Sequence, residues 1–272
     1  MSAPLDDIQF LVDSENRVRA VEALASEPRS RAELRDVTGA SAATISRTLR
    51  AFESRGWVSR EGNRYALTTN GAYVASAFAD FHDCMTTAHD LDDLFPWLPL
   101  EEVGIDVDSL TGARITVASE ENPMAITTRV REVDRWSTRS RSLAPYFPEP
   151  CIDSRHRAVL DGTQTFETVI TPPVVEAAMS LDCATKFEEL VSADRCSVYL
   201  YDGDIPCVGM VNDGTALLVV KDDRNATVGL VETDAQMVVE RFTETFEEYR
   251  TNATLLTPED LGRERDYEVA RT

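Results

Sequence analysis

The sequence predicts an α+β fold, in which a small helical domain with one β-hairpin precedes a larger α/β domain with a mixed sheet. Two observations predict this. Residues 30–67 are patterned in order as helix, turn, helix and hairpin, and from Gly104 onward strand-like runs alternate with helical ones. We place the first domain at residues 1–90 and the second at 104–256. The 272 residues are enough for two domains.

Two helices precede this motif in the expected pattern. Residues 5–12 form a short helix, and Ser14 can cap a second one. The second helix should place four apolar residues on one face, namely Val18, Val21, Leu24 and Ala25. These helices supply the support on which the following motif packs.

Capping residues set the boundaries of the motif. Ser30 followed by Glu33 forms a capping box, so a helix should begin at Arg31. Gly39 can end that helix in the left-handed conformation, and Ser41 can cap the next helix two residues later. The two helices should therefore be joined by a short turn and cross steeply.

The second helix of the motif, expected over residues 42–55, has an apolar face and a polar face. Three apolar residues form a stripe that should face the core: Ile45, Leu49 and Phe52. After Gly56, residues 57–67 form a hairpin around a three-residue loop at 61–63, where glycine and asparagine tolerate positive φ. The order of elements is that of a winged helix-turn-helix, with the hairpin as the wing.

Charge supports a role of this motif in binding nucleic acid. The chain carries a formal net charge of −21, but residues 29–64 hold eight arginines and four carboxylates, which makes them a basic segment. The residues expected to contact double-stranded DNA are Ser41, Thr44, Ser46, Arg47 and Arg50 on the helix and Arg60, Asn63 and Arg64 on the wing. Arg47 is the best candidate for a bidentate contact with guanine.

A longer helix is expected over residues 71–89, capped by Thr69-Asn70. Its apolar residues are spaced alternately by four and three, as in a coiled-coil seam: Val74, Phe78, Phe81, Met85 and Ala88. Such a seam needs a partner. It either pairs with a second copy, giving a homodimer that matches two half-sites, or docks on the chain's own second domain.

The second domain begins after a linker, since Pro96 and Pro99 interrupt the helical pattern of residues 90–103. Strands are expected at 114–118, 166–171, 196–201, 205–211, 216–221 and 226–231, and helices at 123–140, 153–160, 174–193 and 234–251, before a charged tail. Hairpin-type turns at 202–204, 212–214 and 222–225 predict that the last part of the sheet is antiparallel.

Short signatures along the chain accompany the winged helix. They are Asn122-Pro123, Leu143-Ala144-Pro145, Asp161-Gly162, Thr171-Pro172-Pro173, the run from Tyr201 to Pro206, and the run from Phe246 to Arg250. With them the sequence resembles archaeal transcriptional regulators of the methanogenesis-regulator type over nearly its whole length. The resemblance implies a C-terminal regulatory or sensor domain and identifies no ligand residue.

The composition resembles that of proteins from salt-loving archaea. Aspartate and glutamate total 48, and only Lys186 and Lys221 are lysines among 27 basic residues. In high salt the release of counterions contributes little to DNA binding, so hydrogen bonds and groove fit must contribute more. Without an N-terminal signal or an apolar run of about 18 residues, we expect a cytoplasmic protein that does not contact a membrane.

Signatures of catalysis are absent from the sequence. It has no phosphate-binding glycine loop, no G-x-S-x-G, and no lysine two positions after any of its three histidines, which a phosphodiesterase of the phospholipase D type requires. Five cysteines without a C-x-x-C suggest buried thiols rather than a zinc site or disulfides. We therefore expect no enzymatic activity, no cofactor and no metal.

Two weaker patterns have a functional and a structural interpretation. His82 and His89, with Asp83 and Cys84 nearby, would place metal ligands on one helix, but solvated histidines explain them better. A second cluster could hold an anionic effector or simply pair with carboxylates on a solvated helix: Arg129, Arg131, Arg135, Arg139, Arg141, His156 and Arg157. The second interpretation is again favoured.

Together these patterns predict a sequence-specific DNA-binding transcriptional regulator, with the winged helix in the major groove and a C-terminal domain for effector sensing, dimerisation or both. The alternative is a protein-interaction module, in which the winged helix is a scaffold and the acidic C-terminal domain binds a basic partner. The sequence identifies neither the operator nor a small-molecule effector, nor whether transcription is activated or repressed.

Overall fold

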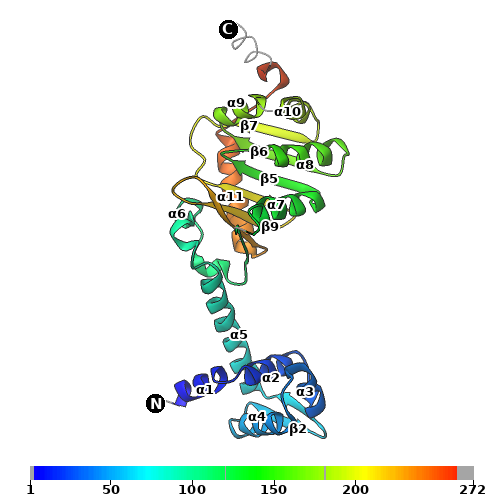
Figure 1. Ribbon diagram of the computed structural model, residues 1–272, viewed down its shortest axis with the longest axis vertical. Helices are drawn as coiled ribbons and strands as arrows, with labels where there is room; N and C mark the ends of the chain where they lie inside the picture. The colour runs from blue at the N-terminus through cyan, green and yellow to red at the C-terminus, as the bar shows by residue number, and fades with distance from the viewer. Residues whose placement is uncertain (1–2, 120, 181, 262–272) are drawn as a thin grey trace. The chain divides into compact units, whose positions relative to one another are not determined.

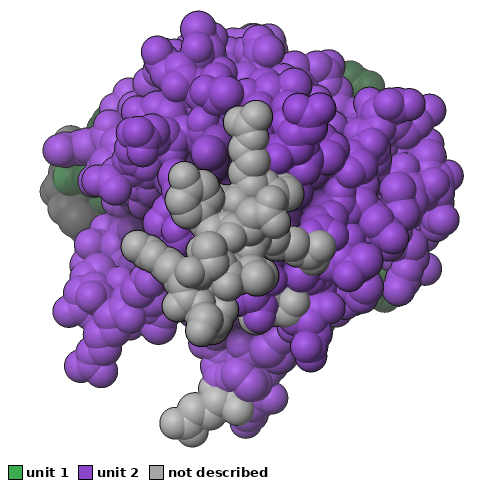
Figure 2. Space-filling view, turned by 90° about the horizontal axis from the view of Figure 1, so that it is seen from above, with its two compact units in different colours: residues 1–85 green, residues 86–272 purple. Residues whose placement is uncertain are grey.

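The computed structural model describes residues 3–119, 121–180 and 182–261. The chain divides into two compact units, residues 1–85 and 86–272 (Figure 2). Helix α5 (Thr69–Asp90) contains the boundary between them. None of the described helices is both long and apolar enough to cross a membrane. The charged tail expected at the end of the chain includes residues 262–272, which lie outside the described residues.

Unit 1 has the predicted order of helix, turn, helix and hairpin (Figure 1). Its elements before α5 are α1 (Ala3–Val12), α2 (Glu15–Ser26), β1 (Arg29–Ser30), α3 (Arg31–Thr38), α4 (Ala42–Ser54), β2 (Val58–Glu61) and β3 (Arg64–Leu67). The three strands form an antiparallel sheet of order β1-β3-β2. The winged helix-turn-helix is therefore confirmed as a fold.

The capping signals of the motif are confirmed at atomic level. The Glu33 amide donates to Ser30 Oγ over 3.3 Å, and the Ser30 amide donates to the Glu33 carboxylate over 2.6 Å. Gly39 has φ 70° and ends α3, and Ser41 Oγ accepts from the Thr44 amide over 3.2 Å. Because each of these bonds joins residues three apart, the sequence alone could specify them.

Other local expectations are wrong. Ser14 precedes α2 but makes no capping bond with its side chain, and Ala25 is exposed. The long helix begins at Thr69, because Thr68 Oγ1 accepts from the Gly71 amide over 3.0 Å and takes the capping role expected of Thr69-Asn70.

The wing has a two-residue loop instead of the expected three. Glu61 pairs with Arg64, so only Gly62 and Asn63 lie between the strands. Gly62 alone of the two has a positive φ, 64°, which matches a type II′ turn with glycine in the first position.

Unit 2 is built on an eight-stranded mixed sheet of order β11-β7-β6-β5-β8-β9-β10-β4. The strands are β4 (Arg114–Val117), β5 (Arg139–Ala144), β6 (Thr165–Ile170), β7 (Cys196–Leu200), β8 (Val208–Asn212), β9 (Thr215–Lys221), β10 (Thr227–Thr233) and β11 (Thr254–Leu255). Strands β5, β6 and β7 run parallel, and the remaining pairs are antiparallel. This confirms the mixed sheet.

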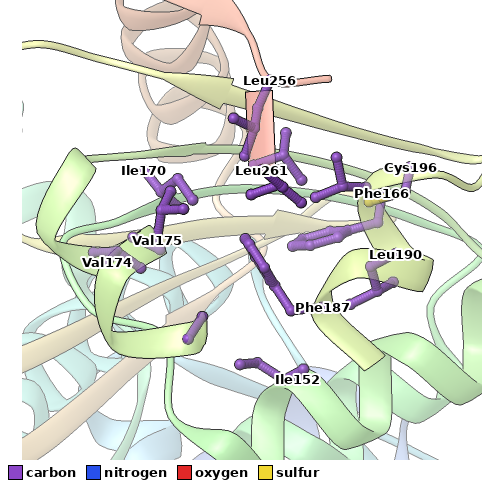
Figure 3. Packing of buried hydrophobic residues seen from close by; sticks show 14 of the residues in the cluster. Ile152, Phe166, Ile170, Val174, Val175, Phe187, Leu190, Cys196, Leu256 and Leu261 are labelled. Carbon is purple, nitrogen blue, oxygen red and sulfur yellow. The ribbon is translucent and has the colours of Figure 1, made fainter. Parts of the chain in front are cut away.

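Helices cover both faces of this sheet (Figure 1). The helices of unit 2 are η1 (Phe95–Trp97), α6 (Leu100–Val103), η2 (Val107–Leu110), α7 (Ala125–Trp136), α8 (Glu149–Leu160), α9 (Pro172–Ser180), α10 (Ala184–Val191) and α11 (Gln236–Thr251). On the face of α8, α9 and α10, Ile152, Val175 and Phe187 pack with Phe166 of β6 (Figure 3). On the other face, Phe246 of α11 packs against Leu143 of β5.

The expected linker at residues 90–103 is instead part of the core of unit 2. Leu91, Leu94 and Val103 are buried, and with the following Ile105 and Leu110 they pack against strands β9 and β10 and helix α11. The two prolines do interrupt the helix, but the leucines around them fill the space between α11 and the sheet. The sequence rule for linkers fails because it weighs the prolines and not the apolar residues beside them.

Three further expectations for unit 2 are wrong. The helix expected over 123–140 ends at Trp136, and the helix expected over 174–193 is broken into α9 and α10. The turn at 202–204 joins no hairpin, because β7 pairs with β6 and β11 whereas β8 pairs with β5 and β9. The turns at 212–214 and 222–225 do join antiparallel neighbours.

Candidate nucleic-acid interface

Helix α4 presents two faces of different chemistry. Ile45, Leu49 and Phe52 are buried in the core of unit 1, together with Thr48. Arg47 and Arg50 are exposed, and the helical period places them opposite the buried stripe. Among the described residues, neither guanidinium has a hydrogen bond, ion pair or ring contact. These two arginines therefore carry the uncompensated positive charge of α4.

Two hydroxyl groups at the start of α4 already form hydrogen bonds within the helix. Ser41 Oγ accepts from the Thr44 amide and lies 3.0 Å from Thr44 Oγ1. Ser41 is exposed, and Thr44 and Ser46 are half-buried. A phosphate oxygen only accepts hydrogen bonds, and the bond between Ser41 and Thr44 already uses one of their two hydroxyl protons. One of these two hydroxyls therefore remains free to donate to a phosphate, and Ser46 can donate its own proton.

The wing carries two arginines with different surroundings. Arg60 Nε donates to the Gly62 carbonyl over 2.9 Å, which holds the side chain along the exposed hairpin. Arg64 donates to Glu33 Oε1 over 2.7 Å and to the Pro28 carbonyl, so its charge is already paired. Asn63 is exposed at the tip.

The bond from Arg64 to Glu33 links the wing to the start of α3. Hydrogen bonds from Ser30 lower the pKa of Glu33, and the positive charges of Arg64 and Arg29 act in the same direction. Glu33 thus serves the capping box and the wing at once. The capping pattern was visible in the sequence, but the partner from the wing was not, because it is 31 residues away.

Most other arginines of the basic segment are bound within unit 1. Arg55 donates to Asp7 over 2.9 Å and lies 3.7 Å from the centre of the Phe10 ring. Arg29 donates to the Ala23 carbonyl, Arg35 pairs with Asp36, and Arg31 lies over the Tyr65 ring. The positive charge available to a ligand is therefore smaller than the composition of the segment suggests.

Helix α5 has an apolar face that unit 1 covers only in part. Phe78 is buried and Val74 packs against the same core, whereas Phe81 and Met85 are 53% and 54% exposed. A groove of about 640 Å³ runs between α1 and α5, and Ile8 and Tyr73 also line it. The sequence analysis did not predict that α1 lines this groove. The apolar residues on the exposed side of α1 were the signal that could have indicated it.

The described residues show the surroundings of the two weaker patterns. No group of three potential metal ligands exists among the described residues, and Cys84 on α5 is exposed, unlike the buried thiol that was expected. Arg129 pairs with Glu232 and Glu132, and Arg141 pairs with Glu167 and Glu247. Arg139 and Arg141 lie on β5 and not on a helix, so that part of the expectation is wrong.

Comparisons with known families cover most of the chain. Residues 5–90 match the family described as the HVO_A0261 N-terminal domain. Residues 123–252 match the middle domain of the methanogenesis regulatory protein FilR1. No functionally curated protein matches the chain at a significant level.

Several solved structures are similar at low identity. TrmBL2, described as an archaeal chromatin protein with a novel mode of DNA binding, is 15% identical, with 92% of this chain and 99% of that chain covered and a TM-score of 0.41. Nuc from Salmonella typhimurium, a phospholipase D family member, is 11% identical, with 53% and 99% covered and a TM-score of 0.43. NucT from Helicobacter pylori is 11% identical, with 53% and 98% covered and a TM-score of 0.42.

Proposed function

We propose that this chain, which belongs to the archaeal transcriptional regulators of the methanogenesis-regulator type, binds double-stranded DNA sequence-specifically with α4 in the major groove. One observation carries the proposal. Arg47 and Arg50 are exposed on the face of α4 opposite the core, and no described residue neutralises them. An arginine so placed can donate two parallel hydrogen bonds to guanine O6 and N7.

The remaining contacts are assigned by exposure and bonding. Ser46, and whichever of Ser41 and Thr44 keeps a free hydroxyl proton, would donate to phosphates beside the groove, and Arg60 and Asn63 on the wing would reach the neighbouring backbone or minor groove. Arg64 would act mainly by fixing the wing, because it already pairs with Glu33. This order of importance separates Arg47 and Arg50 from the other predicted residues.

A second copy of the chain would cover the apolar face of α5. Phe81 and Met85 extend the line of Val74 and Phe78, and both remain about half exposed although Phe81 lines the groove beside α1. A symmetric dimer would present two copies of α4 to two half-sites about one helical turn apart. In this arrangement unit 2 would sense a small-molecule effector.

The DNA proposal is tested with the full-length chain. DNA sequences that bind are selected from a random library, and affinity is then measured at a single salt concentration for wild type and variants. We expect Arg47→Ala to lose about 1–3 kcal/mol of discrimination at one base pair, about 5- to 150-fold in relative affinity. The matched control is Arg35→Ala, which removes an exposed arginine of α3 already paired with Asp36. Unchanged affinity and sequence preference in Arg47→Ala would refute the placement of α4.

The dimer is tested by light scattering after size-exclusion chromatography. Phe81→Ser combined with Met85→Ser should convert a wild-type dimer into a monomer, because a large part of the apolar surface is lost. Met237→Ser on α11 is the control, since Met237 is also an exposed apolar side chain. A wild-type monomer, or a variant that stays dimeric, would overturn this part of the proposal.

A further inference from the structure

Unit 2 contains a cavity, partly open to the surface, that the proposed DNA contacts do not use. It has a volume of about 110 Å³ and lies between α7, α8 and the strands β5, β6, β8 and β9. Strand β5, which contributes to the wall, pairs in parallel with β6 and antiparallel with β8. Ligand pockets are typically apolar hollows with a few polar groups, and this cavity has that character.

The walls of the cavity are apolar and come from separate parts of the chain. Helix α7 contributes Ile126 and Val130, and the strands contribute Phe166, Met210 and Val219. These side chains are buried in their respective cores, so the wall does not depend on an exposed loop. An apolar ligand would gain free energy here by leaving water.

One end of the cavity is polar but electrically balanced. Arg155 Nη2 donates to Asp134 Oδ1 over 2.5 Å, and its Nη1 donates to Gln164 Oε1 over 3.0 Å. Asn212 also donates to Asp134. Because each charge already has its partner, an anionic or cationic ligand would have to lose its hydration without gaining a free counter-charge. The end of the cavity therefore favours an uncharged ligand.

The rim of the cavity offers hydroxyl groups. Thr127, Tyr146 and Thr227 are half-buried there, and the Tyr146 hydroxyl lies 3.3 Å from Thr227 Oγ1. Lys221 Nζ lies 3.5 Å from the centre of the Tyr146 ring and donates to Asn225 Oδ1 over 2.8 Å. Lys221 does not line the cavity, so its charge is directed to these two groups and not to a ligand. A single hydroxyl group on a ligand can replace one of these contacts and bond to its partner.

From size, polarity and charge balance we infer that this cavity binds a small uncharged molecule, at most one ring or a short chain bearing a hydroxyl group. The volume of about 110 Å³ is below the roughly 150 Å³ of a dry apolar cavity that holds benzene, so one ring is the largest group that it accommodates and a hydroxyl group on that ring would lie at the open rim. This deepens the effector role given to unit 2, and only its regulatory consequence rests on the proposed function.

Cys151 provides a local reporter of occupancy, because it lines the cavity. Burial raises the pKa of this thiol to about 11, so it reacts slowly and is best alkylated at mildly alkaline pH. Cys84 is exposed on α5 and serves as an internal control in the same molecule. Alkylation of the full-length chain by iodoacetamide is followed at both cysteines by peptide mass spectrometry.

The probe is phenol, with benzoate and benzylamine as its anionic and cationic counterparts. Alkylation of Cys151 should slow about tenfold when phenol is present at about ten times its Kd, while Cys84 is unaffected. The two charged compounds should not protect Cys151. No protection by phenol, or equal protection by the charged compounds, would overturn the inference.

A matched pair of variants tests the location. Val130→Phe adds a ring to the cavity wall and should abolish protection by phenol, whereas Val133→Phe adds it to the same helix at a residue that packs against the same cluster but does not line the cavity. If Val130→Phe retains protection, phenol binds elsewhere and the inference fails. Should that variant not fold, the comparison of phenol with its charged counterparts in the wild-type chain decides the matter.

The regulatory consequence is measured separately, as the affinity for a selected DNA with and without phenol. Protection of Cys151 with a change in DNA affinity supports both the site and its effector role. Protection without a change refutes the effector role and retains the site. If the chain binds no DNA at all, the proposed function fails while the result at Cys151 still stands.

Discussion

Replacing Arg155 by methionine should destabilise unit 2 by an amount that depends on pH. The side chains of Arg155 and Asp134 are 2% and 3% exposed, and they form a direct ion pair. Burial raises the pKa of Asp134, and the Arg155 guanidinium is the main influence that opposes this. Arg155→Met removes that opposition and leaves Asn212 as the neighbouring donor.

The magnitude follows from the ways in which the variant can respond. Leaving a buried charge without its partner costs about 3–5 kcal/mol. The carboxyl group can instead take up a proton, which costs about 4 kcal/mol at pH 7 and about 1.5 kcal/mol at pH 5, from an unfolded-state pKa of about 3.9. The destabilisation at pH 7 should therefore be about 4 kcal/mol from charge alone.

The sign of the pH dependence follows from the difference in proton binding between the folded and the unfolded chain. In Arg155→Met the folded-state pKa of Asp134 lies above the unfolded value, so the folded chain holds a proton that the unfolded chain releases. Stability then falls as pH rises between the two pKa values, by about 2.7 kcal/mol from pH 5 to pH 7 if the folded-state pKa lies above 7. In the wild type the direct ion pair with Arg155 keeps the carboxylate ionised, so the deficit of the variant relative to the wild type should be smaller at the lower pH.

The assay is urea unfolding at both pH values, followed by hydrogen–deuterium labelling of β6 peptides, with α4 peptides in unit 1 as an internal control. The double variant Asp134→Asn with Arg155→Met has no charge to bury, so its deficit should be the same at both pH values. The reasoning is refuted if Arg155→Met shows an equal deficit at both, or if the double variant keeps the pH dependence.

Three other perturbations test single contacts. Helix propensity alone would make Gly71→Ala stabilise α5 by about 1 kcal/mol. The structure predicts instead that it destabilises unit 1 by more than about 2 kcal/mol, because a Cβ at residue 71 would lie 1.8 Å from the Trp57 carbonyl oxygen. A raised melting temperature would contradict this. Ser30→Ala should cost about 1 kcal/mol and Ser14→Ala less than about 0.5 kcal/mol in thermal unfolding, since only Ser30 caps with its side chain, and equal costs would contradict the assignment. Burial raises the pKa of Asp213, but hydrogen bonds from the Thr138 and Arg139 amides outweigh burial and lower this pKa. The carboxylate should therefore stabilise the fold above about pH 3.9, and this stabilisation should be lost in more acidic solution. Asp213→Asn should remove the loss of stability in acid, and an acid-unfolding profile equal to that of the wild type would argue against this role.

The parts of the fold that the sequence predicts are those specified by short-range bonds. Ser30 with Glu33, Gly39, and Ser41 with Thr44 lie within a few residues of one another, so the helix-turn-helix follows from local chemistry. The antiparallel strands at the end of unit 2 are likewise joined by short turns with characteristic residues.

The central strand β5 shows why the rest could not be predicted. The arginines in its sequence, Arg139 to Ala144, continue the spacing of the arginines in α7, so the segment resembles a continuation of that helix. It becomes a strand because β6 and β8 pair with it, and because Glu167 and Glu247 neutralise Arg141. Those partners are 26 residues or more away, and no pattern within the segment announces them.

Bonds within unit 1 also reduce the positive charge that its basic segment, residues 29–64, can offer to a ligand. Its eight arginines suggested a broad positive surface, but Arg29, Arg35, Arg55 and Arg64 bond to carboxylates or carbonyls of their own unit. These bonds fix the hairpin, the caps and α1 around α4, and leave the unpaired guanidinium groups on α4 itself. A few directed donors on a rigid helix distinguish DNA sequences better than a diffuse positive surface does, since nonspecific attraction weakens with salt while bidentate bonds to bases do not depend on released counterions. For a chain of net charge −21, recognition through Arg47 and Arg50 is therefore physically more consistent than attraction by the domain as a whole.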